Sequence, residues 1–336
     1  MKDLLRTEDL SREDVELILR SAKEFAENPL KVSSQLAGKT VAIYMTKPST
    51  RTRLASESAV AHLGAHPIFL RAEDLQLGRG ETIADTARII SGFCDALIIR
   101  TFKQSDVDEL GKYASIPVIN GLTDDDHPTQ LLADWTTMVE HFGDGFLNGS
   151  GGAGSSGSGA SGSGASGSGS SARKLVYFGD GNNMSHAWLI MGAIMGAHVV
   201  ASTPEGSFAP DASVVKKAQE IAAKSGAKVE VIHDPKEAAR SASVLYTDVW
   251  MSMGDPESER AAKMKALAPY KVDDTLMALA ADDAIFMHCL PAHREEEVAT
   301  SVIDGPRSVI WRQAFHRRTT IQALLYHLVR GELKGR

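Results

Sequence analysis

Short apolar runs of strand length alternate along the first half of the chain with segments in which apolar residues recur at helical spacing. The runs predict strands at Thr40–Met45, Pro67–Leu70, Ala96–Thr101 and Pro117–Asn120. The helical spacing lies between and around them, at Ser11–Glu27, Arg51–Leu63, Glu81–Gly92, Ser105–Ala114 and His127–His141. Strands that alternate with helices in this way are typical of a parallel α/β sheet.

The same alternation continues in the second half. Strands are expected at Leu175–Phe178, His198–Ser202, Lys228–Ile232, Val244–Thr247, Ala284–His288 and Val309–Ile310. Helices are expected at Ser185–Met195, Ser213–Lys224 and Pro235–Ser241, with a last amphipathic helix over about Arg317–Arg330. We therefore predict two doubly wound parallel-sheet α/β domains. Ligands of such sheets bind beyond the carboxyl ends of the strands, so we expect the functional residues in the interdomain cleft.

Residues 149–172 consist only of Gly, Ser and Ala. Such a tract has almost no apolar area to bury and is expected to behave as a flexible linker. We therefore place a first domain at 1–145, completed by a C-terminal helix at 317–336, a linker at 146–173 and a second domain at 174–316. Helices that cross between the two domains are expected to join them.

Composition narrows the function classes. The chain has 336 residues, and 36 Lys and Arg against 43 Asp and Glu give a net charge of −7, which disfavours a nucleic-acid partner. Its only cysteines, Cys94 and Cys289, exclude a disulfide framework. The N-terminal segment carries acidic residues throughout, and the most apolar stretch, Ala187–Ser202, is short for a membrane span. We expect a cytoplasmic protein with no membrane partner.

The most informative segment is Lys47-Pro48-Ser49-Thr50-Arg51-Thr52-Arg53, which follows the first expected strand and opens a helix. A helix N-terminus offers unpaired N–H groups and a partial positive charge. Hydroxyl groups and an arginine at that place can hold a phosphate. The structural alternative is that Ser49 or Thr50 only caps the helix and the arginines are solvated.

A second group of polar residues follows two other strands. Asp126-His127-Pro128-Thr129-Gln130 comes after the strand that ends near Asn120, and Arg100 ends another strand. The histidine can donate to a carbonyl oxygen, the glutamine can bond a neighbouring amide, and the arginine adds a cation at the same edge. Taken alone, a histidine of this kind is more often structural.

Two features of the second half allow more than one interpretation. Gly179-Asp180-Gly181-Asn182-Asn183-Met184 suggests a dinucleotide turn, but Met184 stands where the third glycine of GxGxxG belongs, which makes an NAD-dependent oxidoreductase a weak alternative. Cys289 could be a nucleophile, a ligand or an inert core residue. No histidine pair has a metal-ligand spacing such as HExxH, so no metal site is expected.

The combination of Ser49-Thr50-Arg51-Thr52-Arg53 with His127-Pro128-Thr129-Gln130 resembles the aspartate/ornithine carbamoyltransferase family. The resemblance covers essentially the whole chain except the Gly/Ser/Ala tract. Three segments resemble the ornithine members: Gly179–Met184, Asp248–Gly254 and His288-Cys289-Leu290-Pro291. Aspartate members have a Pro-Leu-Pro-Arg type segment where this chain reads His-Cys-Leu-Pro. The resemblance implies transfer of the carbamoyl group from carbamoyl phosphate to the δ-amine of L-ornithine, without a cofactor, by a homotrimer with sites at its subunit interfaces.

The resemblance also implies roles for single residues. Those expected at carbamoyl phosphate are Ser49, Thr50, Arg51, Thr52, Gln76, Arg100, His127, Gln130, Cys289, Leu290 and Arg317. Gln76 would reach the site of an adjacent subunit. Those expected at L-ornithine are Asn183, Asp248, Ser252 and Met253. Arg100, His127, Cys289 and Asp248 would take part in the chemistry.

Two segments depart from the family pattern. Met45-Thr46-Lys47 replaces the usual Phe-Glu-Lys, and Phe315-His316-Arg317 replaces the usual Glu-Asn-Arg, which leaves Arg318 as an alternative to Arg317. Two other functions stay open at this stage. One is a carbamoyltransferase for a different amine or amino acid, and the other is a non-catalytic relative that binds carbamoyl phosphate.

Overall fold

The computed structural model describes residues 1–77, 80–148, 173–251 and 256–336. Its first domain is built on a four-stranded parallel sheet in the order β2-β1-β3-β4. The strands are β1 (Thr40–Met45), β2 (His66–Arg71), β3 (Ala96–Arg100) and β4 (Val118–Leu122). The helices of this half are α1 (Arg12–Glu27), α2 (Thr50–His62), α3 (Ile83–Phe93), α4 (Gln104–Tyr113) and α5 (Pro128–Phe142).

The second domain has a five-stranded parallel sheet in the order β7-β6-β5-β8-β9. Its strands are β5 (Lys174–Phe178), β6 (His198–Ser202), β7 (Lys228–Val231), β8 (Ala242–Thr247) and β9 (Ile285–His288). Its helices are α6 (Asn183–Ile194), α7 (Ala212–Ser225), α8 (Pro235–Ala239), α9 (Arg260–Leu267), α10 (Asp274–Leu279) and α11 (Thr300–Ile303). The prediction of two parallel α/β sheets is confirmed.

Alternating residues of the strands face two different cores, as the period of a strand requires. In β1, Val41 and Ile43 belong to one apolar cluster, whereas Ala42 and Tyr44 belong to another. The first cluster continues into the second domain, where it includes Leu175 of β5. One apolar core therefore runs from sheet to sheet and holds the two domains together.

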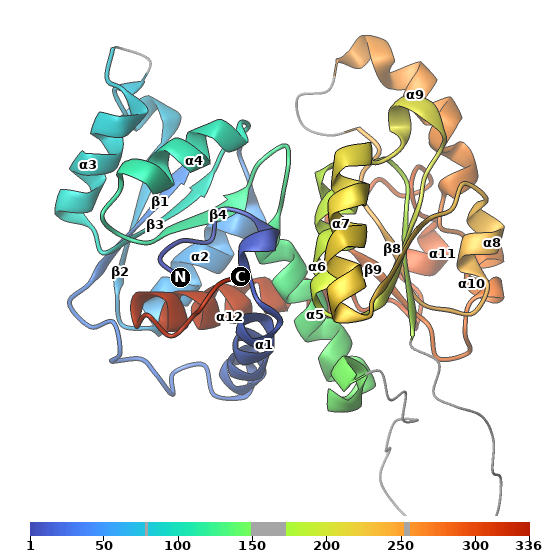
Figure 1. Cartoon of the computed structure of the whole chain (residues 1–336), viewed down its shortest axis with the longest axis horizontal. Helices are drawn as coiled ribbons and strands as arrows, with labels where there is room; N and C mark the ends of the chain where they lie inside the picture. The colour runs from blue at the N-terminus through green and yellow to red at the C-terminus, as the bar shows by residue number, and fades with distance from the viewer. Residues whose placement is uncertain (78–79, 149–172, 252–255) are drawn as a thin grey trace, which may run out of the picture.

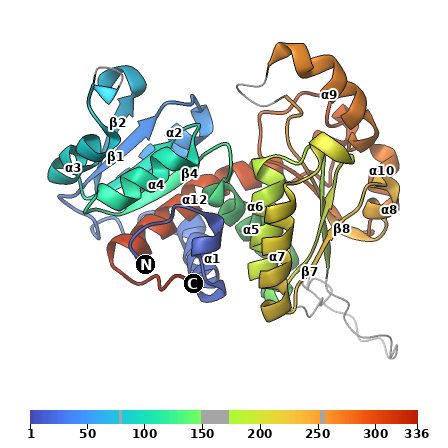
Figure 2. The ribbon, with the colours of Figure 1, turned by 45° about the horizontal axis from the view of Figure 1, so that its top comes forward.

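Two helices carry this connection. Helix α5 lies between the sheets, and α12 (Ile310–Val329) packs along it, so that the last helix of the chain returns to the first domain (Figures 1 and 2). None of the helices in the described ranges is long and apolar enough to cross a membrane.

The last helix differs from the expectation. The structure has no strand at Val309–Ile310, because Val309 is the N-cap of α12 and Ile310 is its first residue. The preceding residue, Ser308, forms an isolated β-bridge to Phe286 of β9. The helix expected from Arg317 thus begins at Ile310, and it ends at Val329 rather than continuing to 336. In its first two turns the polar residues Gln313 and His316 are buried. Because polar residues occupy buried positions there, the sequence of these turns does not show the apolar face of an amphipathic helix.

Candidate active site

A cavity of about 1120 Å³ lies between the two domains, at the carboxyl ends of strands from both sheets. It is lined from the first domain by residues after β1, β3 and β4 and from the second domain by residues after β5, β8 and β9. The expected site residues that line it are Ser49, Thr50, Arg51, Arg100, His127, Gln130, Asn183, Asp248, Cys289, Leu290 and Arg317. Residues far apart in the sequence therefore share one cavity.

The N-terminus of α2 forms the wall on the side of the first domain. Ser49 is its N-cap, and the Ser49 hydroxyl accepts a hydrogen bond from the Thr52 N–H at 3.2 Å. The capping interpretation of Ser49 is therefore correct, yet Ser49, Thr50 and Arg51 also line the cavity. Thr52 is buried just behind this surface. The first N–H groups of the helix, which have no carbonyl partner within it, lie at the cavity wall.

Three arginines converge on this helix end. The Arg100 guanidinium donates to the Lys47 carbonyl at 3.1 Å and to the Thr52 hydroxyl at 3.4 Å. Arg317, from α12, donates to the same hydroxyl at 3.2 Å and to Gln130 Oε1 at 2.6 Å.

Burial and the neighbouring cations lower the pKa of Arg100 to about 9, and burial lowers that of Arg317 to about 10. Burial also lowers the pKa of Arg51. Because all three remain charged at neutral pH, the cavity wall has an excess of positive charge that an anion would relieve.

His127 lies among these cations. It is the N-cap residue of α5, and its backbone N–H donates to the Asp126 carboxylate at 2.7 Å. Burial, together with the charges of Arg317 and Arg100, holds the pKa of His127 well below 6.5. The imidazole is therefore neutral at neutral pH and can donate one hydrogen bond into the cavity.

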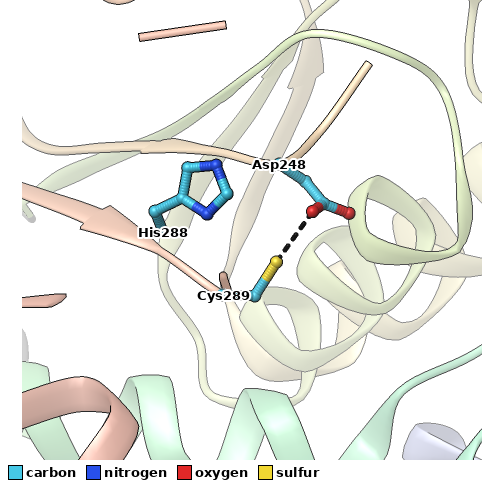
Figure 3. A group of neighbouring side chains, drawn as sticks. All are labelled: Asp248, His288 and Cys289. Atoms are coloured by element: carbon cyan, nitrogen blue, oxygen red, sulfur yellow. Dashed lines mark hydrogen bonds between the residues drawn. The ribbon is translucent and has the colours of Figure 1, made fainter. Parts of the chain in front are cut away.

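The wall on the side of the second domain carries a thiol–carboxylate pair. The Cys289 thiol, after β9, points at Asp248, after β8, and donates to its Oδ1 at 2.9 Å (Figure 3). The same oxygen accepts from the Val249 N–H at 2.8 Å. Burial and the Asp248 carboxylate raise the pKa of Cys289 well above 9. Cys289 is therefore a neutral thiol and a hydrogen-bond donor, not a thiolate.

His288 supports the loop that carries Cys289. Its Nδ1 accepts from the Leu290 N–H at 2.8 Å, so a ring proton lies on Nε2, which contacts the Glu297 carboxylate at 3.1 Å. Leu290, whose N–H makes this contact, has a left-handed backbone with φ of 59°. Asp248, His288 and Cys289 have potential metal-ligand atoms within 4.8 Å of one another, but both ring nitrogens of His288 already have partners.

The amide groups at the start of α6 complete the cavity. Asn182 caps the helix through its Oδ1, which accepts from Met184 N–H at 2.9 Å, and its buried Nδ2 has no partner among the described residues. Asn183 donates through Nδ2 to the Thr123 carbonyl of the first domain at 2.8 Å. A ligand that uses the Asn183 amide must compete with this contact between the domains.

Comparison with known proteins decides which family has this arrangement. The chain matches the model of the carbamoyl-phosphate-binding domain of aspartate/ornithine carbamoyltransferases over residues 2–140. It matches the model of their Asp/Orn-binding domain over residues 171–328.

The chain belongs to the aspartate/ornithine carbamoyltransferase family.

Relatives within this family are similar over nearly their whole length. The chain is 45% identical to the anabolic ornithine carbamoyltransferase of Pyrococcus furiosus over 99% of this chain and 98% of that protein. It is 46% identical to the ornithine carbamoyltransferase of Anoxybacillus flavithermus over 98% and 96% of the two chains. Among solved structures, the ornithine carbamoyltransferase of Pyrococcus furiosus gives a TM-score of 0.86 at 45% identity, covering 99% of this chain and 98% of that one. The anabolic enzyme of Campylobacter jejuni gives 0.85 at 34% identity, covering 98% and 100%.

Two of the expected residues that the structure describes, Thr52 and Gln76, are not among those that line the cavity, and Thr52 lies buried behind its wall. Gln76 is exposed and lies outside the residues that line the cavity. Ser252 and Met253 lie outside the described residues.

The departure from the carbamoyltransferase pattern at Phe315-His316-Arg317 leaves the arginine in place. Arg317 lines the cavity, whereas Arg318 lies on another face of α12 and contacts His62 at 2.8 Å and Gln322 at 3.0 Å. His316 instead contacts Glu140 of α5 at 2.8 Å.

Sequence reasoning missed two ion pairs at the cavity. Lys47 donates to Asp124 at 2.6 Å, and Lys263 of α9 pairs with Asp180 at 2.6 Å with both side chains nearly buried. Lys47 and Asp180 lie in the two segments Lys47–Arg53 and Gly179–Met184, which were singled out from the sequence for other residues. Lys263 belongs to a short helix with no local motif, so nothing in its surroundings in the sequence marked it.

Proposed function

We propose that this chain is an ornithine carbamoyltransferase, which transfers the carbamoyl group of carbamoyl phosphate to the δ-amine of L-ornithine and gives L-citrulline and phosphate. One observation carries the proposal. Arg51, Arg100, Arg317 and a neutral His127 surround the N-terminus of α2, and the Asp248–Cys289 pair lies in the opposite wall of the same cavity. A site for a phosphate ester and a site for an amino acid therefore share one cavity.

The phosphate would lie at the N-terminus of α2. The hydroxyls of Ser49 and Thr50 donate to its oxygens together with the free N–H groups of the first helical turn. The Arg51 guanidinium has the planar shape that bonds two phosphate oxygens at once, and Arg317 adds a second cation. Because burial and mutual repulsion lower the pKa values of Arg100 and Arg317, a bound dianion restores favourable electrostatics around them.

The carbamoyl group would lie next to this phosphate. Arg100, the neutral His127 and the Thr52 hydroxyl face its carbonyl oxygen, where negative charge develops in the tetrahedral transition state. Gln130 and the backbone carbonyls of Cys289 and Leu290 accept from the carbamoyl NH₂. No cofactor is needed for this step, because carbamoyl phosphate is already activated.

L-Ornithine would enter from the second domain. Asp248 receives its α-amino group through Oδ2, since Oδ1 already accepts from Cys289 and Val249. Asn183, Ser252 and Met253 hold the rest of the amino-acid end, and Asn183 exchanges its contact with Thr123 for the ligand. The δ-amine has a pKa of about 10.4 in water, and burial in the cavity favours its neutral, nucleophilic form. The Cys289 thiol orients that amine without forming a covalent intermediate.

We also propose the finer points that the resemblance suggests about the assembly and its compartment. The active form is a homotrimer with sites at the subunit interfaces, in which the exposed Gln76 contributes to the site of the neighbouring subunit. The enzyme works in the cytoplasm.

A citrulline assay on two arginine variants tests the function. Arg51→Ala removes a guanidinium at the cavity, and kcat/KM for carbamoyl phosphate should fall at least about a hundredfold. Arg53→Ala is the matched control, because Arg53 pairs with Glu57 at 2.9 Å and stacks on Phe69 outside the cavity. The control should stay within about threefold of the unmodified enzyme. Absence of citrulline formation by the unmodified protein, or equal losses in the two variants, would contradict the proposal.

A further inference from the structure

A buried carboxylate lies behind the cavity, on the same helix as Gln130 and one turn after it. Asp134 of α5 has no exposed surface. A single oxygen, Oδ1, accepts hydrogen bonds from the side-chain amides of two glutamines, Gln130 at 2.8 Å and Gln313 at 2.7 Å. Asp134 does not line the cavity itself, so any effect on a substrate must act through these two residues.

The contact with Asp134 fixes which end of the Gln130 amide faces the cavity. A glutamine side chain has one donor group, its NH₂, and one acceptor, its carbonyl oxygen. Because the NH₂ donates to Asp134, the oxygen Oε1 points the other way and accepts from Arg317 at 2.6 Å. Gln130 therefore presents an acceptor, and not a donor, at the cavity wall.

Gln313 carries the same constraint to the other domain. Its NH₂ donates to Asp134, and its Oε1 accepts from the backbone N–H of His288 at 2.9 Å. His288 is the last residue of β9 and directly precedes Cys289 and Leu290. Hydrogen bonds thus lead from Arg317 through Gln130, Asp134 and Gln313 to the loop that closes the cavity on the second domain.

We propose that Asp134 is a positioning residue that makes the site selective for a carbamoyl group. It holds Gln130 with its carbonyl oxygen toward the substrate, where that oxygen can accept from the carbamoyl NH₂. An acyl phosphate of the same shape that carries a methyl group instead cannot donate to this oxygen. This inference rests on the proposed function and adds the residue that makes the enzyme prefer a carbamoyl to an acetyl group.

The orientation of Gln130 does not depend on the charge of Asp134. Burial raises the pKa of Asp134 to about 7, so both protonation states occur near neutral pH. Because Oδ1 accepts from both glutamines, the proton of the neutral form is expected on the other oxygen, Oδ2. Oδ1 accepts from both glutamines in either state. An asparagine at this position can keep the same acceptor, whereas a leucine has none.

The test measures binding of two phosphonates that differ in a single group. Phosphonoacetamide keeps the carbonyl and NH₂ of carbamoyl phosphate, and 2-oxopropylphosphonate has a methyl group in place of the NH₂. Calorimetric titration gives both affinities without turnover. The unmodified enzyme should bind the amide at least about tenfold more tightly, because the ketone leaves the Gln130 oxygen without that donor.

Variants of Asp134 test whether the preference for the amide over the ketone depends on this carboxylate. Asp134→Leu should reduce the preference to about twofold or less, because the Arg317 contact alone then holds the Gln130 amide and its NH₂ has lost its acceptor. Asp134→Asn should keep most of it. Thr136→Ala is the control, since Thr136 is equally buried on α5 but donates only to the Leu132 carbonyl at 2.8 Å, and it should keep the full preference.

Thermal unfolding checks that each variant folds, and Asp134→Ala replaces the leucine variant if that one does not. A full preference in folded Asp134→Leu would overturn the inference, and so would an equal loss in Asp134→Leu and Asp134→Asn. If the unmodified enzyme bound both phosphonates equally, the inference would fail while the proposed function stood. If it bound neither, the proposed function itself would fail.

Discussion

At the scale of single residues, the site depends on the protonation states that burial imposes. Burial and nearby cations keep His127 neutral, and burial beside a carboxylate keeps Cys289 a thiol. Both groups are therefore donors at neutral pH, although an isolated histidine or cysteine could play other parts. The excess positive charge belongs to the arginines, where a phosphate dianion can use it.

His127→Gln should lower kcat about a hundredfold and leave KM for carbamoyl phosphate within about threefold, because the hydrogen bond to the carbonyl oxygen strengthens mainly in the transition state. Since the pKa of His127 lies well below 6.5, protonation of this residue should not reduce kcat at pH 6.5. The pH dependence of citrulline formation checks both points. An inflection at pH 6.5 that disappears in His127→Gln would contradict the assignment.

The variants Cys289→Ser and Cys289→Ala test whether the Cys289 thiol acts as a hydrogen-bond donor or as a nucleophile. Serine keeps a hydroxyl that can donate to Asp248, so kcat/KM for ornithine should stay within about tenfold of the unmodified enzyme. Alanine removes the donor and should cost about a further tenfold. Steady-state kinetics with varied ornithine measure the difference. Complete loss of activity in the serine variant would instead favour a covalent role for the thiol.

The sequence predicted some residues of the site much better than others. Motifs drew attention to Arg51, His127 and Cys289, because each lies in a short segment with an unusual local pattern. Asp134 and Gln313 have no such pattern, since each is a single polar residue within a helix. Their importance comes from hydrogen bonds between elements that are distant in the sequence.

At the scale of elements, the strands were the most predictable feature. Buried parallel strands such as β1 and β3 appear as continuous apolar runs, and their expected and observed bounds agree closely. The short helices α9, α10 and α11 were missed, because four to eight residues show little of a helical period, although α8, which is as short, was predicted. Val309–Ile310 was wrongly expected to be a strand, because two β-branched residues at a helix start look the same as a short strand.

Helix α12 is joined to α5 by charges that should matter for stability. Glu140 accepts from the Arg312 guanidinium and contacts His316, and these contacts lower the pKa of Glu140 from 4.5 to about 2. A carboxylate with a lowered pKa stabilises the folded state above its unfolded pKa and loses that effect as the pH falls toward the folded pKa.

Glu140→Gln should therefore lower the free energy of unfolding at pH 7 by about 1–2 kcal/mol, after allowance for solvent screening of this half-buried pair. The difference from the unmodified enzyme should shrink as the pH falls below about 4.5 and approach zero near pH 2. Urea unfolding at several pH values measures it. A difference that grows with acidity would show that the pair does not act through the Glu140 charge.

At the scale of the whole molecule, two parallel α/β domains were predicted, and the structure and the family assignment confirm them. The domains share one apolar core, yet the cavity between them is crossed by contacts such as Asn183 with Thr123. Substrates that bind to both walls must alter such contacts. We therefore expect substrate binding to affect the relative placement of the domains.

The Gly/Ser/Ala tract at 149–172 lies outside the described residues. We expect the tract to make it less favourable for the two domains to close over the substrates, without abolishing turnover. A variant with half the tract removed should have a lower KM for ornithine by about two- to fivefold, as the shorter loop has less closure entropy to lose. Measurement of kcat and KM in the two forms tests this. Undetectable turnover in the long form alone would contradict it.

Titration with a bisubstrate analogue, in which a phosphonate is joined to ornithine through an acyl group, tests the account most directly. If the arginines at α2 and the Asp248–Cys289 pair bind the two halves of one molecule, the analogue gains from both walls for a single loss of translational freedom. Its dissociation constant should be at least about a hundredfold below that of phosphonoacetamide or of ornithine alone. An analogue that binds no better than the tighter of these two would mean that the two walls do not serve one reaction.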